Sequence, residues 1–234
     1  MSSMRGGMLA RHNLQLILTR TENLPRVLDV GGCASPLNTA THMIDCLPYE
    51  DAGAPLVEGA PIRLRADGWT VADVCAAPWP FPDGFFDFAF CSHLLEDVRD
   101  PMHVCRELAR VARAGYVETP SRLRESTHTK QGYRWRRVIG RPVRVGFGHH
   151  RWFVEREGDG LVFTAKTLTA IASPSYFVTI EELGRRLTPE EASLTLFWEG
   201  VLPARERLLI RPGETEADLA DFKRKALATL AARR

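Results

Sequence analysis

The segment 26–33, which reads RVLDVGGC, constrains the fold of this chain more than any other. Its aliphatic residues predict a buried parallel strand, and Asp29 stands near the carboxyl end of that strand. Gly31 and Gly32 then allow the backbone to turn tightly and a ligand to approach it closely. Open α/β sheets hold nucleotide-like ligands at strand ends of this kind, so the segment predicts such a site.

Strand-like and helix-like segments alternate along the chain, which is typical of an α/β protein. Strands are expected at 26–30, 41–45, 69–74, 85–91 and 116–119, with helices at 8–23 and from Asp100 to near Gly115. A hairpin is expected at 152–165, a polar helix at 180–187, closing strands at 194–198 and 206–210, and an amphipathic helix at 215–234. The sequence therefore predicts a Rossmann-like, doubly wound α/β fold, whose mostly parallel, seven-stranded sheet has an antiparallel edge strand and an insertion after the fifth strand.

The length and composition of the chain are those of one ordinary globular domain, with 234 residues and a charged fraction of 26%. Its five cysteines form no C-x-x-C pair, which favours reduced thiols in the cytoplasm over a disulfide framework or a zinc site. The sequence has no run of about 18 apolar residues, and the segment 1–11 lacks the apolar core of a signal peptide. We therefore expect a single cytoplasmic domain over 1–234 that does not enter a membrane.

The charge of the chain is unevenly distributed, although its net value is only +2. Residues 121–156 contain ten Lys and Arg but only two Glu, whereas the remainder has more acidic than basic residues. A basic segment on an acidic body favours the binding of an anion, such as a carboxylate, a phosphate or a nucleic acid. The alternative is a solvated insertion whose charges pair with the acidic remainder.

Three successive predicted strands end in a carboxylate, namely Asp29, Asp45 and Asp73. Carboxylates along the rim of a sheet suit a ligand with hydroxyls and amines, and they would repel a pyrophosphate. The dinucleotide pattern G-x-G-x-x-G is also interrupted by Cys33 and Pro36, and the sequence has no G-x-x-x-x-G-K-[ST] segment. These observations disfavour a dinucleotide or a nucleoside triphosphate as the ligand.

A longer motif at 80–101 reads PFPDGFFDFAFCSHLLEDVRDP. With VLDVGG at 27–32, Asp45 and Asp73, it resembles the class I S-adenosylmethionine-dependent methyltransferases, in particular the branch that reads PFPDGSFDxVxxSHVLEHVxDP. The resemblance covers 26–120 well and continues as architecture through the closing strands. It implies a cofactor-binding half at 26–120, a basic, aromatic substrate-binding insertion at 121–175, and closing strands with a C-terminal helix at 194–234.

The resemblance also implies S-adenosylmethionine as the cofactor, held at the strand ends. The glycine turn would lie under its methionine part, one carboxylate would accept hydrogen bonds from the ribose hydroxyls, and another would accept one from the adenine amine. The implied cofactor residues are Gly31 and Gly32 in the turn, Asp29 behind it, Asp45 with Cys46 at the ribose, Asp73 with Val74 at the adenine, and Ser92 with His93 near the methyl group.

Three positions depart from the family pattern. Cys33 and Ser35 stand where the glycine turn G-x-G-x-G has glycine, and Asp97 stands where the branch often has a second histidine. The two side chains in the turn fill space near the amino-acid end of the cofactor. They favour the alternative that the chain is a non-catalytic partner protein, which keeps the methyltransferase fold without turnover.

Methyl transfer is an in-line displacement, and it needs a general base only when the nucleophile arrives protonated. The candidates for this base are His93, Glu118, Tyr133, His149 and His150. The last two belong to the run GFGHHRW at 146–152, whose histidines either act in the site or merely cap and pack the loop. Adjacent histidines on one loop rarely both reach one ion, so we expect no metal site.

Aromatic and basic residues are interleaved in the insertion, which we expect to form a lid over the substrate. The residues expected to contact the substrate are Tyr133, Arg151 as an anion clamp, and Trp152. Such a pocket favours methylation of an O or N atom of a small acidic molecule of secondary metabolism, by a monomer or a homodimer. The alternative acceptor is a nucleic acid, because arginine and aromatic side chains also bind single-stranded nucleic acids.

Overall fold

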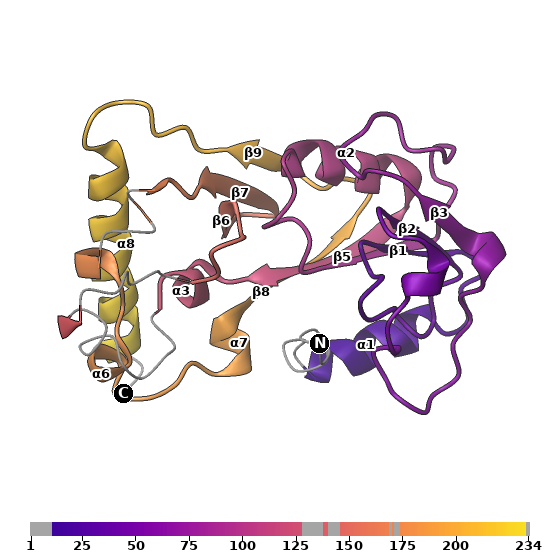
Figure 1. Ribbon diagram of the computed structural model, residues 1–234, viewed down its shortest axis with the longest axis horizontal. Helices are drawn as coiled ribbons and strands as arrows, with labels where there is room; N and C mark the ends of the chain where they lie inside the picture. Colours follow the sequence, from indigo (N-terminus) through magenta and orange to yellow (C-terminus); the bar gives the residue numbers. More distant parts are fainter. Residues whose placement is uncertain (1–10, 128–137, 140–145, 169, 171–173, 233–234) are drawn as a thin grey trace.

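Six strands form the central sheet of the computed structural model, which describes residues 11–127, 138–139, 146–168, 170 and 174–232. They are β1 (Val27–Val30), β2 (His42–Asp45), β3 (Trp69–Val71), β4 (Phe88–Ser92), β5 (Ala114–Pro120) and β8 (Ser193–Glu199). Their order is β3-β2-β1-β4-β5-β8, and every neighbouring pair is parallel except β5 and β8 (Figure 1). This arrangement confirms the predicted mostly parallel sheet with an antiparallel edge strand.

The strand order reverses between β1 and β4, because β2 follows β1 on one side of the sheet and β4 adjoins it on the other. Ligands of open α/β sheets bind outside the carboxyl ends of the strands at such a point. The fold thus creates a crevice directly after Val30, where the sequence places its two glycines.

The described helices are α1 (Arg11–Thr21), α2 (Pro101–Val111), α3 (Arg122–Glu125), α6 (Ile180–Leu183), α7 (Pro189–Ala192) and α8 (Glu214–Ala231). Helix α2 begins where the sequence predicts, because the Asp100 carboxylate accepts a hydrogen bond from His103 N over 2.8 Å. Helix α6 ends at Leu183 instead of 187, since the backbone of Gly184 turns to a φ of +68°. No described helix is both long and apolar enough to cross a membrane.

Both faces of the central sheet are buried, which explains why its inner strands read as continuous apolar runs. Alternate residues point to opposite faces. One face packs against α1 and carries Val27, Phe88, Phe90 and Tyr116 beside Ile17. The other packs against α2 and carries Leu28, Val30, Ala89, Cys91 and Val117 beside Val104 and Leu108.

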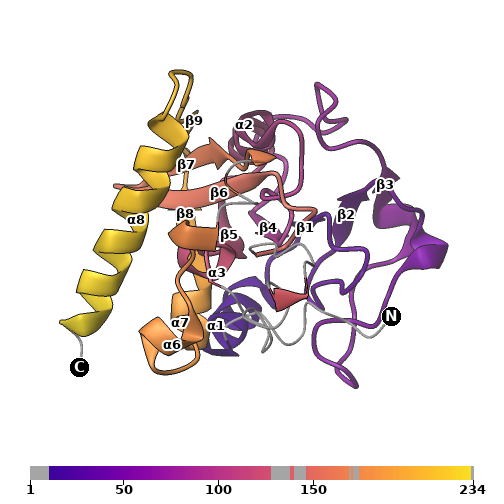
Figure 2. The same ribbon diagram turned by 60° about the vertical axis from the view of Figure 1, so that its left-hand side comes forward.

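A second sheet of three strands shares the α2 side of the molecule (Figure 1). Its strands are β6 (Trp152–Glu157), β7 (Gly160–Ala165) and β9 (Ala204–Glu206), in the order β6-β7-β9. Strands β6 and β7 form the predicted hairpin within the insertion. Helix α8 runs beside this small sheet at the end of the molecule far from β3 (Figure 2). Leu219 of this helix packs with Phe153 of β6.

The predicted seventh strand of the central sheet, at 206–210, is wrong. Strand β9 ends at Glu206 and pairs in parallel with β7 of the small sheet. Pro203 O accepts a hydrogen bond from Leu161 N over 2.8 Å. A Cβ on Gly160 would lie 2.7 Å from that oxygen, so the glycine permits this pairing. The apolar residues that suggested a buried strand are instead exposed, Leu208 by 65% and Ile210 by 79%.

Candidate active site

A cavity of about 410 Å³ opens at the carboxyl ends of β1 and β2, where the strand order reverses. Of the residues implied to hold a cofactor, its lining contains Gly31, Asp45, Cys46, Asp73 and Val74. The lining also contains residues that the sequence did not single out for a ligand, namely Ala34, Leu47, Cys75, Leu94, Val98 and Arg99. Arg151, expected to bind substrate, lines the same cavity.

Gly31 forms the floor of the cavity beside Leu94. Its backbone has a φ of +69°, in the left-handed region that favours glycine, and its N–H donates to Ile44 O over 2.9 Å. A Cβ at this position would lie 2.7 Å from Leu94 Cδ1. Glycine therefore lets the turn pass close under any ligand in the cavity.

Asp29 and Gly32 lie behind the turn, outside the residues that line the cavity. The Asp29 side chain is fully buried and accepts a hydrogen bond from Leu37 N over 2.8 Å. A Cβ on Gly32 would overlap the Asp29 carboxylate. These two residues therefore shape the turn that carries Gly31.

Asp45 ends β2 and is buried at the cavity wall. One carboxylate oxygen accepts a hydrogen bond from Cys33 N over 3.0 Å, and the other accepts one from Leu47 N over 3.0 Å. Each oxygen of a carboxylate can accept more than one hydrogen bond. The backbone bonds thus fix the orientation of Asp45 and leave it able to accept from a ligand hydroxyl.

The turn tolerates the two departures from the glycine pattern. Cys33 is buried in the cavity wall, and its carbonyl accepts a hydrogen bond from Gly53 N over 2.8 Å. Ser35 points away into the neighbouring loop, where its hydroxyl donates to Ala54 O over 3.2 Å. The non-glycine turn is therefore held by the loop at 53–54.

Asp73 and Arg99 form an ion pair at the cavity wall. Arg99 Nη1 lies 2.5 Å from one oxygen of Asp73, and Cys75 N donates to the other oxygen over 2.8 Å. The hydrogen bond from Arg99, with a smaller contribution from Cys75 N, holds the pKa of Asp73 below its usual value. A ligand amine that binds Asp73 would share this carboxylate with Arg99.

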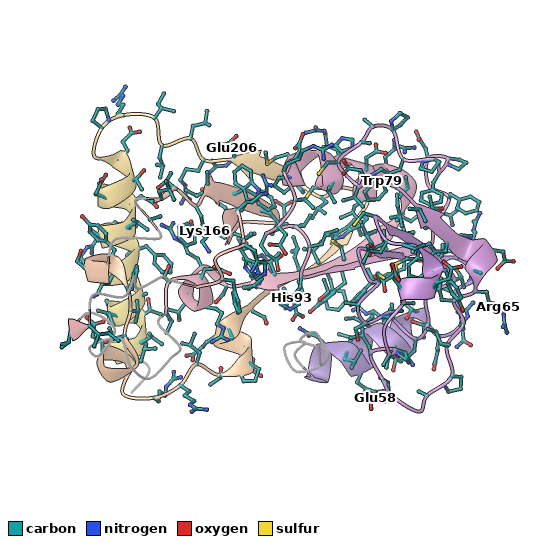
Figure 3. All side chains as sticks on the ribbon, in the orientation of Figure 1. Glu58, Arg65, Trp79, His93, Lys166 and Glu206 are labelled. Carbon is teal, nitrogen blue, oxygen red and sulfur yellow. The ribbon has the colours of Figure 1, made fainter. Side chains whose placement is uncertain are left out.

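His93 lies in the interior near the middle of the molecule, between two carboxylates (Figure 3). Its Nδ1 is 3.4 Å from Glu96 and its Nε2 is 3.4 Å from Glu118. Burial by itself lowers the pKa of His93, but hydrogen bonds to Glu118 and Glu96 outweigh it and raise the pKa to about 9. Neither His93 nor Ser92 is among the residues that line the cavity.

Glu118 is fully buried on β5, and the Tyr116 hydroxyl donates a hydrogen bond to it. Asn13 of α1 in turn donates to the Tyr116 oxygen over 3.1 Å. This chain of contacts places Glu118 in the packing between the sheet and α1, and it does not line the cavity.

The insertion contacts the half of the chain at 26–120 where its strand β6 begins. Arg151 N and Trp152 N both donate to Glu96 O, over 2.7 and 3.2 Å, and Trp152 Nε1 donates to Val98 O over 2.9 Å. These bonds bring the Arg151 side chain to the cavity, whereas Trp152 does not line it. Tyr133, the third expected substrate residue, lies outside the described residues.

The two adjacent histidines belong to a second cluster. His150 is buried, and its Nδ1 forms a hydrogen bond with the Glu125 carboxylate. Lys166 Nζ lies 2.5 Å from the other oxygen of Glu125. Burial by itself raises the pKa of Glu125, but His150 and Lys166 outweigh it and lower that pKa. His149 is exposed, and neither histidine lines the cavity.

Comparison with protein families gives one match. Residues 49–117 match a family model described as a methyltransferase domain. The matched part runs from the loop after β2 through most of β5, so it contains Asp73 and the long motif but starts after the glycine turn. No curated protein sequence matches the chain.

Several solved structures are similar to part of the chain. YcgJ from Bacillus subtilis is 20% identical over 48% of this chain and 52% of its own, with a TM-score of 0.33. An S-adenosylmethionine-dependent methyltransferase from Mesorhizobium loti is 16% identical over 50% of this chain and 56% of its own, with a TM-score of 0.35. The chain thus spans about half the length of these two proteins.

The family match and the sheet agree with each other. The matched residues include the strands on both sides of the cavity, and the strand order 3-2-1-4-5 ends in an antiparallel edge strand. Residues 49–117 are thus similar to a methyltransferase domain, and the sheet that contains them is mostly parallel with an antiparallel edge strand.

Proposed function

We propose that this chain transfers the methyl group of S-adenosylmethionine to an O or N atom of a small acidic molecule. The observation that carries the proposal is the position of Arg151, which comes from the insertion and lines the same cavity as Asp45 and Asp73. One cavity therefore combines carboxylates, which suit the cofactor, with a guanidinium, which suits an anionic acceptor.

The residues of the cavity fit the cofactor. A volume of about 410 Å³ lies in the range of ligand pockets. Asp45 would accept hydrogen bonds from the ribose hydroxyls and Asp73 from the adenine amine, while Gly31 leaves room beneath the methionine part. When bound, the cofactor supplies an electrophilic methyl group on a cationic sulfur, and nearby carboxylates favour that charge.

Arg151 supports an acidic acceptor because its side chain is exposed within the cavity wall, where it can form a paired hydrogen bond with a carboxylate or phosphate. Trp152 would hold Arg151 in place through its bond to Val98. The side chains of His93, Glu118 and His150 are buried and do not line this cavity. This favours an acceptor that is already deprotonated, such as a carboxylate, which needs no general base.

The cysteines support a reducing compartment as the place of the reaction. In the described part of the chain, none of the cysteines, at positions 33, 46, 75, 91 and 105, forms a disulfide. Accessible thiols such as those of Cys46 and Cys75 persist most readily where thiols are kept reduced, as in the cytoplasm.

The experiment has two stages. Calorimetry first measures the affinity for S-adenosylmethionine, and labelled cofactor is then used to screen carboxylated and phosphorylated metabolites. Arg151→Met should raise the KM of an anionic acceptor by about tenfold or more, because a charge-assisted bond is lost, while the Kd of the cofactor stays unchanged. Arg156→Met is the matched control, since Arg156 lies on β6, which directly follows Arg151, but outside the cavity lining.

Three outcomes would overturn the proposal. Failure to bind the cofactor at high micromolar concentration argues against the activity itself. A cofactor Kd that rises in Arg151→Met assigns Arg151 to the cofactor carboxylate instead of the acceptor. Methylation of an oligonucleotide, with an affinity that falls steeply as salt rises, would replace the small acceptor by a nucleic acid.

A further inference from the structure

Three side chains with metal-ligating atoms meet beside the cavity. Asp97, His149 and His150 each offer one ligand atom, and these atoms all lie within 4.8 Å of one another. Asp97 belongs to the loop after β4, and the histidines belong to the segment that leads into β6. The bonds from Arg151 N and Trp152 N to Glu96 O hold these two segments together. The backbone therefore fixes the cluster.

The orientation of His150 favours metal binding. Its Nδ1 is engaged by Glu125, which leaves Nε2 facing Asp97 Oδ1 at 3.9 Å. Histidine ligands of metals almost always place their other nitrogen on a carboxylate or carbonyl in this way. Glu125 is itself held by Lys166, which also donates to Phe147 O over 2.9 Å. The ring is thus fixed before any ion arrives.

The Asp97 carboxylate has an oxygen that could coordinate a cation. Its Oδ1 is buried and makes no hydrogen bond within the part of the chain that the structure describes. Tetrahedral zinc with ligands at about 2.0–2.1 Å needs ligand atoms about 3.4 Å apart. The distance of 3.9 Å between His150 Nε2 and Asp97 Oδ1 is therefore only slightly too long, and His149, being exposed, is able to move.

We propose that Asp97, His149 and His150 bind a divalent first-row transition metal ion, with Glu125 as a positioning residue. Two imidazoles and one carboxylate suit zinc, iron or manganese, whereas calcium and magnesium prefer oxygen ligands alone. The adjacent histidines, which we expected not to reach one ion together, both lie at the same carboxylate because they sit on a turn against the loop that carries Asp97.

The position of this site connects it with the cavity. Val98 and Arg99, which follow Asp97, and Arg151, which follows His150, line the cavity. Three protein ligands leave at least one coordination position open, as in catalytic zinc sites. An oxygen of the acceptor could occupy that position. This use of the ion rests on the proposed function, whereas binding of the ion does not.

Titration of chelator-treated protein with Co²⁺ tests the proposal, because its visible absorption reports the ligands. We expect one ion per chain and a spectrum typical of nitrogen and oxygen ligands. His149→Ala and Asp97→Asn should each weaken binding by about tenfold or more. His103→Ala is the matched control, since His103 lies on α2 outside the cluster. Absence of binding, or equal binding by His149→Ala and His103→Ala, would overturn the proposal.

His149→Ala is the main variant because its side chain is exposed and its loss should not disturb the packing. Glu125→Gln tests the positioning role. It should weaken Co²⁺ binding by about 10–100-fold and shift the absorption bands, which loss of stability alone would not do. Binding of Co²⁺ without binding of S-adenosylmethionine would contradict the proposed function but support the metal site. Binding of S-adenosylmethionine without binding of Co²⁺ would contradict only the metal site.

Discussion

Trp152 Nε1 donates a hydrogen bond to the backbone oxygen of Val98 over 2.9 Å, across 54 positions of the chain. Trp152 begins β6, and Val98 lines the cavity. This bond and the bonds from Arg151 N and Trp152 N to Glu96 O join the insertion at 121–175 to the half of the chain at 26–120. The position of Arg151 in the cavity depends on these bonds.

Trp152→Phe should therefore lower the free energy of unfolding by about 1–2 kcal/mol, because it leaves the Val98 oxygen without its donor. Urea denaturation measures the change. Trp69→Phe is a matched control, since Trp69 Nε1 also donates over 2.9 Å, to Leu47 O, but at an exposed position where water replaces it. Equal losses in the two variants would contradict a special role for the Trp152 bond.

Asp45→Ala should weaken the binding of S-adenosylmethionine by about 2 kcal/mol, or roughly 30-fold, through loss of charge-assisted hydrogen bonds to the ribose. Calorimetry measures the affinity. Asp51→Ala removes an exposed carboxylate outside the cavity lining and should leave the affinity unchanged. An unchanged Kd in Asp45→Ala would show that the ribose lies elsewhere.

Gly32→Ala should destabilise the fold by about 2–4 kcal/mol, because the new Cβ displaces the buried Asp29 carboxylate from Leu37 N. A double-mutant cycle separates this clash from other effects. Once Asp29→Ala has removed the carboxylate, adding Gly32→Ala should cost at least about 1 kcal/mol less than the same substitution costs in the wild type. Chemical denaturation of the four proteins measures the coupling, and additive losses would refute the clash.

The half of the chain at 26–120 could be predicted because its signals are local. The inner strands, buried on both faces, read as short apolar runs, and Asp45 ends one of them. Asp73 follows the more exposed edge strand β3 by two residues. Parallel strands then bring their carboxyl ends to one edge of the sheet. The joint position of these two carboxylates with Gly31 in one cavity follows from that topology.

The remaining features join segments that no local pattern connects. Arg99 pairs with Asp73 across 26 positions, and His150 bonds Glu125 across 25 positions. Periodicity identifies a buried face but not the partner that covers it. The pairing of β9 with β7, which replaced the predicted seventh strand, depends on Gly160 admitting the Pro203 carbonyl. Tertiary packing, which no local sequence pattern encodes, brings the partners of all three contacts together.

Arg122→Met should lower the free energy of unfolding by about 3 kcal/mol, since it removes the buried cation between two partly buried carboxylates and leaves them only the more exposed Arg207. Arg122 is 3% exposed, lies 2.6 Å from Glu155 and also pairs with Asp218 of α8. Arg185→Met is the control, because Arg185 forms a solvent-exposed pair with Glu191, and exposed pairs contribute little to stability. Thermal denaturation of both variants checks the difference, and similar losses would contradict this account.

His93 should make the stability of the protein fall as the pH becomes alkaline. Its pKa is raised from 6.5 to about 9 by its hydrogen bonds to Glu118 and Glu96, which outweigh burial. A raised pKa means that the folded state holds the proton more tightly than the unfolded state. The contribution is therefore complete below about pH 6.5 and is lost as the pH rises through about 9.

The size of this contribution is on the order of 3 kcal/mol. His93→Asn is the variant that tests it, because asparagine accepts the positive φ of 53° at this position and does not titrate. Urea denaturation at about pH 6 and about pH 10 should show a larger loss of stability for the wild type than for the variant. If both proteins lose stability equally between these pH values, the titration belongs to other groups, and His93 is not held as a cation between the two carboxylates.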